Sequence, residues 1–247
     1  MRIVAIDQLK GVALILMIIY HIIVMIPQMN LGYINTNNIF IELIGKISHT
    51  IFILTSGINL YLSFKKNKEK FYNSQYTRLF KLLIGSLIMS YISYLAFGDT
   101  LYVKFGILHF LLISTLLSYP ILESKKLSIM FLCINLIVIL LISKKKEIFN
   151  SICKSNPLLC FNLGIYNQYN YNYQSLDHFP IFPKYSHFLI GVIMGQFIDT
   201  DILSPNELYL PKFVEILGKN TFEIYIVHWF VIYFIYYILG GRPIKSL

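Results

Sequence analysis

The sequence predicts an all-α fold, a polytopic bundle of about seven transmembrane helices in a single domain over residues 1–247. Composition gives the first reason, since 56% of the residues are hydrophobic and 13% are charged, whereas soluble domains carry roughly 25% charged residues. The second reason is that apolar runs long enough to cross a bilayer recur along the chain, with short polar stretches between them. Lipid is therefore expected to surround most of the chain.

Each predicted span is an apolar stretch that approaches the roughly 20 residues a helix needs to cross the hydrocarbon. We expect spans at about residues 10–27, 38–63, 79–97, 104–122, 127–143, 185–199 and 215–239. The stretch at 185–199 is the shortest. No internal repeat is apparent, although many transporters are built from such repeats.

The basic residues predict how the bundle is oriented. The connection between the second and third spans is the most basic, with Lys65, Lys66, Lys68, Lys70, Arg78 and Lys81. Short cytoplasmic loops are enriched in Lys and Arg, so we expect a cell-membrane protein with a cytoplasmic N-terminus and, for an odd number of spans, an external C-terminus. Residues 144–146, all lysine, lie in a connection that this orientation places outside.

The net charge of +9 does not indicate nucleic-acid binding. The basic residues flank apolar runs, where membrane topology and anionic lipid headgroups account for them. The bilayer is thus the expected partner, and no nucleic acid is expected.

The longest connection, about residues 144–184, is expected outside the cell. Its tract at 166–173 alternates tyrosines with amides, a composition able to stack on sugar rings and to bind their hydroxyls. An interfacial or unstructured loop is the alternative. Cys153 and Cys160 share this connection, and a disulfide between them is left open.

Ionisable groups in the first predicted span suggest a functional stripe. Asp7, Lys10 and His21 fall within about 60° of one another on one helix face. Charged and imidazole side chains are costly inside a membrane unless they face the bundle interior or a wet cavity. The structural alternatives are a helix cap for Asp7, a snorkelling side chain for Lys10 and a packing role for His21.

Polar residues recur in three further predicted spans: Glu42, Lys46, His49 and Ser56 in the second, His109 in the fourth, and Thr221, Tyr225 and His228 in the seventh. Histidines from four spans predict a shared polar interior. No HxxxH or HExxH spacing favours a metal site. A GxSxG elbow and phosphate-binding glycine loops are also lacking, which leaves acyl transfer by an imidazole base as the favoured chemistry.

The opening of the chain, with Ile6-Asp7-Gln8-Leu9-Lys10-Gly11 and then His21, resembles that of the heparan-α-glucosaminide N-acetyltransferase-like membrane proteins. Lys10 and His21 also fit the Arg/Lys-x10-His signature of the related acyltransferase type three proteins. Similar blocks follow in the expected order at residues 52–60, 105–110, 176–183 and 224–228. Lysine stands at position 10 where arginine is more usual, and His178 stands where the family pattern has tyrosine. The large lumenal domain of the animal lysosomal enzymes is missing, so the resemblance does not imply heparan itself as substrate.

The resemblance implies that an acetyl group passes from cytoplasmic acetyl-CoA across the bilayer to an amine or hydroxyl of a sugar or glycan. His21 is the expected general base or acyl carrier, with His109 and Asp177 orienting the imidazole or the acceptor. Lys10, Arg78 and Lys81 are expected to bind the CoA phosphates. Structural or orienting roles are expected for Asp7, Tyr225 and His228, and no metal is expected.

Two other functions remain open from the sequence. A transporter or flippase for a small solute could use the intramembrane histidines as proton relays. A structural subunit of an envelope complex is the third reading. Self-association into a homo-oligomer, the identity of the acceptor and the length of the acyl chain are left open.

Overall fold

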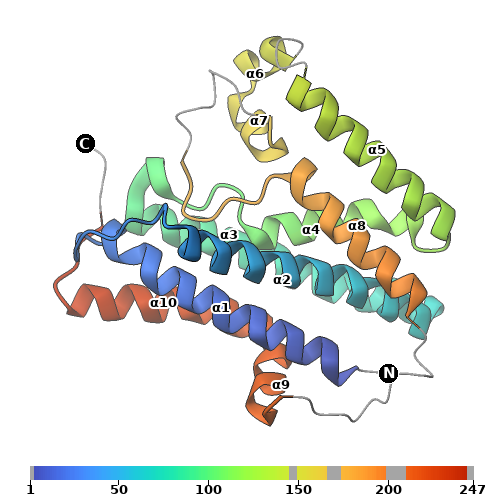
Figure 1. The fold of residues 1–247 in the computed structure, drawn as a ribbon, viewed down its shortest axis with the longest axis horizontal. Helices are drawn as coiled ribbons and strands as arrows, with labels where there is room; N and C mark the ends of the chain where they lie inside the picture. The colour runs from blue at the N-terminus through green and yellow to red at the C-terminus, as the bar shows by residue number, and fades with distance from the viewer. Residues whose placement is uncertain (1–2, 145–148, 166–173, 199–209, 244–247) are drawn as a thin grey trace. The chain divides into compact units, whose positions relative to one another are not determined.

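The computed structural model describes residues 3–144, 149–165, 174–198 and 210–243, and Figure 1 shows their helical fold. The helices are α1 Val4–Gln28, α2 Ile39–Lys66, α3 Lys68–Leu101, α4 Ile107–Ser118, the 3-10 turn η1 Tyr119–Ile121, α5 Lys125–Lys144, α6 Asn150–Ser155, α7 Pro157–Leu163, α8 Ile181–Phe197, α9 Lys212–Lys219 and α10 Thr221–Ile238. Within the described ranges there is no strand, and one isolated bridge pairs Phe105 with His178. The predicted all-α class is confirmed.

Five of the described helices are long and apolar enough to cross a membrane, namely α1, α2, α3, α5 and α10. The other two predicted spans correspond to shorter helices: α4, which continues into η1, and α8, which has 17 residues. Both lie at the positions where the sequence predicts them.

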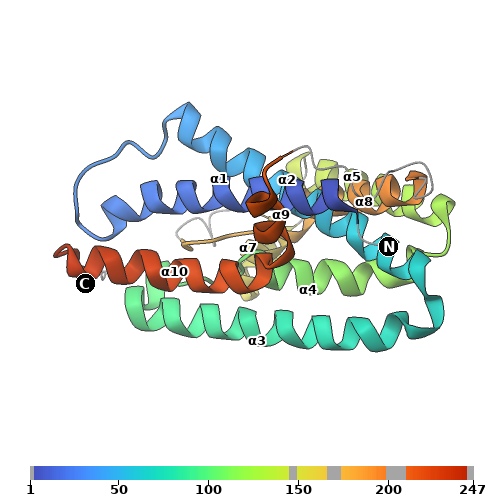
Figure 2. The same ribbon diagram turned by 90° about the horizontal axis from the view of Figure 1, so that it is seen from below.

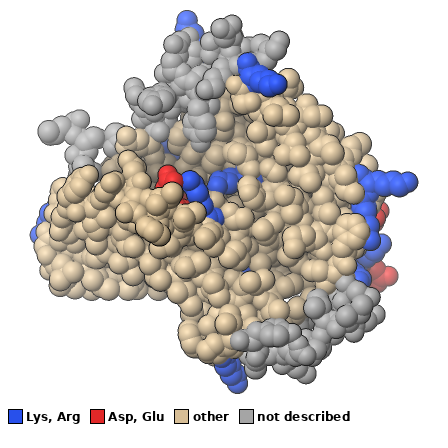
Figure 3. All heavy atoms as spheres, in the orientation of Figure 1, with Lys and Arg blue, Asp and Glu red and all other residues tan. Residues whose placement is uncertain are grey.

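Helix α5 shows that its surroundings are apolar. Its buried residues are Ser128, Asn135 and Ile142, whereas Ile137 and Leu140 are exposed. Soluble helices bury their apolar face instead. Charged side chains are also few on the face that Figure 3 shows. Lipid is the solvent that fits this inside-polar arrangement.

Two compact units divide the chain, one from residues 1–55 and 198–245 and the other from residues 56–197. The boundary falls within α2. The single domain that the sequence predicts over residues 1–247 therefore stays a prediction.

In the first unit, α1 packs against α9 with almost no side chain between them. A Cβ on Gly11 would lie 2.0 Å from the Val214 carbonyl oxygen, and a Cβ on Gly218 would lie 1.7 Å from that of Asp7. Only glycine fits at both points, because any other residue would push the two backbones apart. These two glycines fix where α9 crosses α1.

Helix α10 runs alongside α1 and in the same direction (Figure 2). His21 meets His228, the Tyr236 hydroxyl donates to the Ile22 carbonyl at 2.6 Å, and the Arg242 amide donates to the Met29 carbonyl at 2.8 Å. The residue numbers of the bonded partners increase together along the two segments, as expected for helices that run in parallel. The hydrogen bonds thereby fix the register of α10 on α1.

In the second unit, polar bonds join α5 to α8. The Asn135 amide donates to the Phe182 carbonyl at 3.1 Å, and the Gln196 amide donates to the Ser128 hydroxyl at 2.9 Å. A Cβ on Gly57 would lie 2.3 Å from the Phe188 carbonyl oxygen, so α2 also approaches α8 closely. Small and polar residues at contacts are typical of helix packing in membranes.

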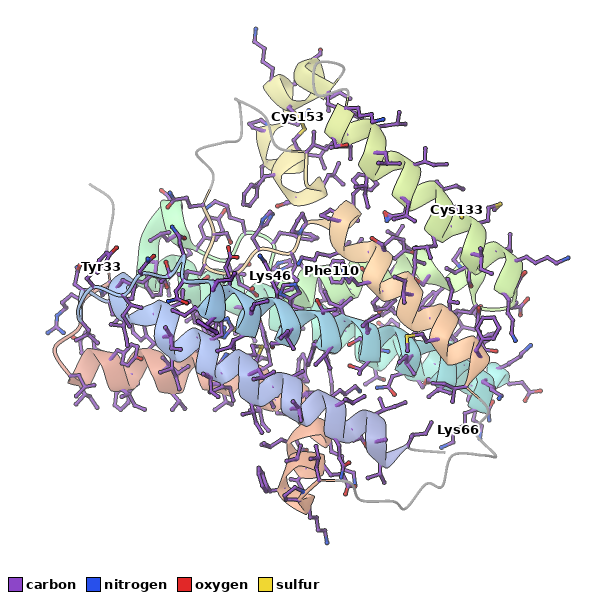
Figure 4. All side chains as sticks on the ribbon, in the orientation of Figure 1. Tyr33, Lys46, Lys66, Phe110, Cys133 and Cys153 are labelled. Atoms are coloured by element: carbon purple, nitrogen blue, oxygen red, sulfur yellow. A yellow bond between two sulfur atoms is a disulfide. The ribbon has the colours of Figure 1, made fainter. Side chains whose placement is uncertain are left out.

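A disulfide joins Cys153 in α6 to Cys160 in α7, with 5.5 Å between their Cα atoms, and Figure 4 labels Cys153. Both cysteines are fully buried. The pairing that the sequence leaves open is therefore present in the structure. Cys133, labelled on α5 in the same figure, is a free, exposed cysteine.

Two segments differ from the sequence prediction. The basic stretch after the second span is helical rather than a loop, because only Asn67 separates α2 from α3 and its side chain caps the Lys70 amide at 2.9 Å. Lys, Arg, Glu and Gln are good helix formers, so both helices extend beyond their apolar parts. The last predicted span, 215–239, is interrupted at Asn220, which divides α9 from α10.

Candidate active site

The first unit pairs two of the predicted histidines. His21 in α1 and His228 in α10 are both buried, and Nδ1 of His21 lies 2.9 Å from Nε2 of His228. Their rings are nearly parallel, 17° apart, with centroids separated by 5.1 Å. The structure thus brings together two side chains that are 207 residues apart in the sequence.

The hydrogen bonds around this pair decide which nitrogens carry protons. Nδ1 of His228 lies 3.2 Å from the Ile224 carbonyl oxygen, which can only accept, so this nitrogen must carry a hydrogen. In a neutral imidazole Nε2 of His228 is then an acceptor, and Nδ1–H of His21 donates to it. Nε2 of His21 keeps its lone pair. This is the protonation state that a general base or nucleophile requires.

Aromatic rings enclose the pair. The Tyr225 ring lies 5.4 Å from that of His228, and the Trp229 ring lies 4.8 Å from that of His21. Tyr225 is a predicted site residue and is buried here. Trp229 was missed, because a tryptophan in a run of aromatic and aliphatic residues reads as packing. Its position directly after His228 is the signal that could have found it.

A cavity of about 550 Å³ opens beside the pair, between α1 and α10. His228 and Glu223 line it together with the aliphatic side chains Ile18, Ile22, Val227 and Val231. His228 thus forms part of the wall of an apolar space between two helices of the same unit, and His21 lies behind it rather than in the wall. A small substrate group such as an acetyl would fit a space of this size.

The remaining predicted residues of the first unit lie nearer the start of α1. Asp7 is buried beneath Gly218 of α9, and Lys10 is half-buried one turn later. The helix cap considered for Asp7 is wrong, since the N-cap of α1 is Ile3. Asp7, Lys10 and His21 all belong to one continuous helix, as the sequence predicts.

His109 and Asp177 belong to the second unit. Nε2 of His109 lies 3.4 Å from the Ser90 hydroxyl. The Asp177 carboxylate accepts from the Ile107 amide at 3.2 Å, in the first turn of α4, where Gly106 has no side chain to do so. A carboxylate at a helix N-terminus stabilises the helix. Asp177 therefore has a structural role, and the orienting roles of both residues stay predictions.

The loop that carries Asp177 is held against α7. The imidazole of His178 stacks on Phe161 with centroids 3.7 Å apart, and its Nε2–H donates to the Phe161 carbonyl at 3.1 Å. Burial lowers the pKa of His178 to about 4, so it stays neutral at physiological pH. The histidine that replaces the family's tyrosine thus acts as an uncharged aromatic.

Arg78 in α3 has the surroundings of an anion site. Among the described residues its hydrogen-bond partner is the Gln75 side chain, at 3.4 Å, and no carboxylate neutralises it. It interacts electrostatically with Tyr119, whose buried hydroxyl has no partner in the described part of the chain. A cation beside an unsatisfied hydroxyl suits a phosphate group. Lys81, one turn further along, is exposed.

The tyrosine and amide tract at 166–173 lies outside the described residues. Within the described ranges, no three His, Cys, Asp or Glu side chains are grouped as metal ligands would be.

Residues 2–230 match the family model of the heparan-alpha-glucosaminide N-acetyltransferase catalytic domain. The chain belongs to this family. The match covers all five long apolar helices at least in part, together with both histidines of the buried pair. The resemblance inferred from the sequence is confirmed, and the protein is a multi-pass member of a transmembrane acetyltransferase family. Comparisons with curated proteins and with solved structures gave no match.

Proposed function

We propose that this protein transfers an acetyl group from acetyl-CoA, across the membrane, to an amine or hydroxyl of a sugar. The observation that carries the proposal is the buried His21–His228 pair, whose hydrogen bonds leave Nε2 of His21 as a base. Membership of the N-acetyltransferase family supports the acetyl group and the amine class of acceptor.

His21 is the proposed catalytic base, with His228 as its positioning residue. Nε2 of His21 takes the proton from the acceptor while the acceptor attacks the acetyl carbon. Positive charge then develops on His21. His228 supports that charge because it accepts from Nδ1–H and is itself held by the Ile224 carbonyl. A base of this kind typically accelerates transfer by about 10²- to 10⁴-fold.

The acyl donor is proposed to bind through its phosphates. Arg78 is the best-supported contact because it lacks a carboxylate partner among the described residues and interacts with the unsatisfied Tyr119 hydroxyl. Lys10 is proposed as a second contact, because it lies about 16 Å before His21 along α1 at 1.5 Å per residue. That separation suits the long arm that joins the phosphates of CoA to its thioester. Lys81 stays a proposed contact from the sequence.

The proposed setting is the cell membrane with a cytoplasmic N-terminus, so that the donor enters from the cytoplasm. Acetyl-CoA is too polar to cross a bilayer by itself, and the thioester must therefore reach the acceptor through the protein. A sugar or glycan on the outside is the proposed partner.

The test measures acetyl transfer and acetyl-CoA affinity on purified protein in nanodiscs, with a radiolabelled acetyl group and glucosamine as the first acceptor. His21→Ala should abolish transfer and leave acetyl-CoA binding within about threefold. Lys10→Ala and Arg78→Gln should instead weaken binding by roughly 10- to 100-fold, and more at low salt, because a charge-assisted contact is typically worth about 1.5 to 3 kcal/mol.

His187→Ala is the matched control, since it removes a half-buried histidine of α8 that lies in the other unit. It should leave transfer unchanged. A folded His21→Ala protein that transfers acetyl at the wild-type rate would sink the proposal. Proton-coupled solute uptake by wild-type vesicles, without any transfer or slow acetyl-CoA hydrolysis, would favour a transporter instead.

A further inference from the structure

Trp229 in α10 carries one polar group, the N–H of its indole ring. The side chain is only 6% exposed, and its indole Nε1 has no hydrogen-bond partner in the part of the chain that the structure describes. A buried donor left without a partner destabilises the fold, because it has given up its hydrogen bonds to water and gained none in return. A phenylalanine would supply an aromatic ring at this position without that cost. The unpartnered N–H therefore calls for an explanation.

The position of Trp229 beside the histidine pair explains why an indole N–H is present there. Its ring is inclined at 45° to that of His21, with centroids 4.8 Å apart, and lies 6.1 Å from that of His228. The three rings thus form one cluster, and Trp229 follows His228 directly on α10. The buried N–H that lacks a partner belongs to a ring in contact with the proposed base.

We propose that the Nε1–H of Trp229 donates a hydrogen bond to the carbonyl oxygen of the acetyl thioester, and more strongly to the oxyanion formed from it. This inference rests on the proposed function. To the proposed catalytic base it adds a second catalytic residue, a hydrogen-bond donor that stabilises the oxyanion.

The acceptor nitrogen or oxygen forms a bond to the acetyl carbon, its proton passes to Nε2 of His21, and the C=O electron pair moves onto the oxygen that faces Trp229. When that pair returns, the C–S bond breaks, and the CoA thiolate leaves and takes the proton from His21. A donor aimed at such an oxyanion is worth more in the transition state than in the ground state. Removing one typically costs about 10²- to 10³-fold in kcat.

Trp229 is the only tryptophan of the chain, so a tryptophan analogue fed to an auxotroph replaces this residue alone. β-(3-Benzothienyl)alanine keeps the two fused rings and has sulfur in place of the N–H. We expect it to lower kcat by roughly 10²-fold while the KM for acetyl-CoA and the melting temperature change little. Trp229→Phe should give a similar loss of kcat. Turnover of the benzothienyl protein within about threefold of wild type would overturn the inference.

A second readout does not depend on turnover. With ¹⁵N-labelled tryptophan the protein gives one indole N–H signal, and we use acetonyl-CoA, an unreactive ketone that keeps the carbonyl oxygen. The signal should move downfield with acetonyl-CoA and not with CoA. An unmoved signal with saturating acetonyl-CoA would count against Trp229 even if transfer is present. Conversely, wild-type protein that transfers no acetyl group contradicts the proposed function. The indole signal then still tests whether Trp229 binds the carbonyl oxygen, because it does not depend on turnover.

Discussion

At the scale of single residues, the bond between His21 and His228 has a direction. The Ile224 carbonyl can only accept, which fixes the proton of His228 on Nδ1 and makes its Nε2 the acceptor for His21. Without that carbonyl either histidine could donate. One backbone oxygen in α10 thereby sets the tautomer of the proposed base in α1.

This direction predicts how substitutions at position 228 behave. His228→Ala removes the acceptor for Nδ1–H of His21 and should lower kcat by roughly 10²-fold with little change in the KM for acetyl-CoA. His228→Gln offers a side-chain oxygen as acceptor and should recover part of the rate. Steady-state kinetics on both variants, with melting temperatures as a check on folding, test this. Equal rates for the Ala and Gln variants would show that the hydrogen bond does not matter.

At the scale of helices, the first unit depends on how closely α9 crosses α1. The backbones touch at Gly11 and Gly218, and the Gln8 side chain adds a bond to the Leu210 carbonyl at 3.1 Å. Helix α9 leads directly through Asn220 into α10, which carries His228. The glycine contacts thus help to hold α10 in the register that pairs the histidines.

Gly218→Ala should therefore destabilise the protein by about 1 to 3 kcal/mol, the usual cost of forcing extra atoms into a packed contact. The added Cβ would meet the backbone of Asp7, which cannot turn aside. Gly45→Ala is the control, because the atoms nearest to its Cβ would belong to the Tyr20 ring, a side chain that can shift, rather than to a backbone. Thermal unfolding in detergent compares them. The expectation is wrong if the two variants melt at the same temperature.

At the scale of the whole molecule, the parallel course of α1 and α10 constrains the topology. Successive spans alternate in direction, so two spans that run the same way are the first and last of an odd number of crossings. This agrees with the odd number that the sequence predicts. We therefore predict that the start of α1 and the end of α10 lie on opposite sides of the membrane.

Cysteine accessibility tests which side is which. In a Cys133→Ser background, which removes the free, exposed cysteine, Arg242→Cys should react with an impermeant maleimide on intact cells and Lys68→Cys should react only after lysis. The basic ends of α2 and α3 predict this order. Labelling of Lys68→Cys from outside would reverse the orientation, and labelling of both from outside would contradict the odd number of crossings.

The sequence by itself determined that the chain lies in lipid, that its fold is all-α and which family it belongs to. Long apolar runs with few charges can only be satisfied as membrane helices, because no other arrangement pairs the backbone in lipid, and the spacing from Lys10 to His21 lies within one helix. These properties are local, so the order of residues is enough to read them. The sequence does not reveal that the basic segment at 65–81 is helical, because a cluster of charges between two apolar runs is equally typical of a loop.

Only the tertiary structure decided which distant groups meet. It paired His21 with His228 and placed the Trp229 ring against that of His21. It also joined Cys153 to Cys160 and brought the Asp177 carboxylate to the first turn of α4. Hydropathy and helical periodicity say which face of a helix is polar, but they carry no information on which helix that face will contact. Close backbone approaches at glycines and single carbonyl acceptors settle that choice, and they exist only once the helices have packed.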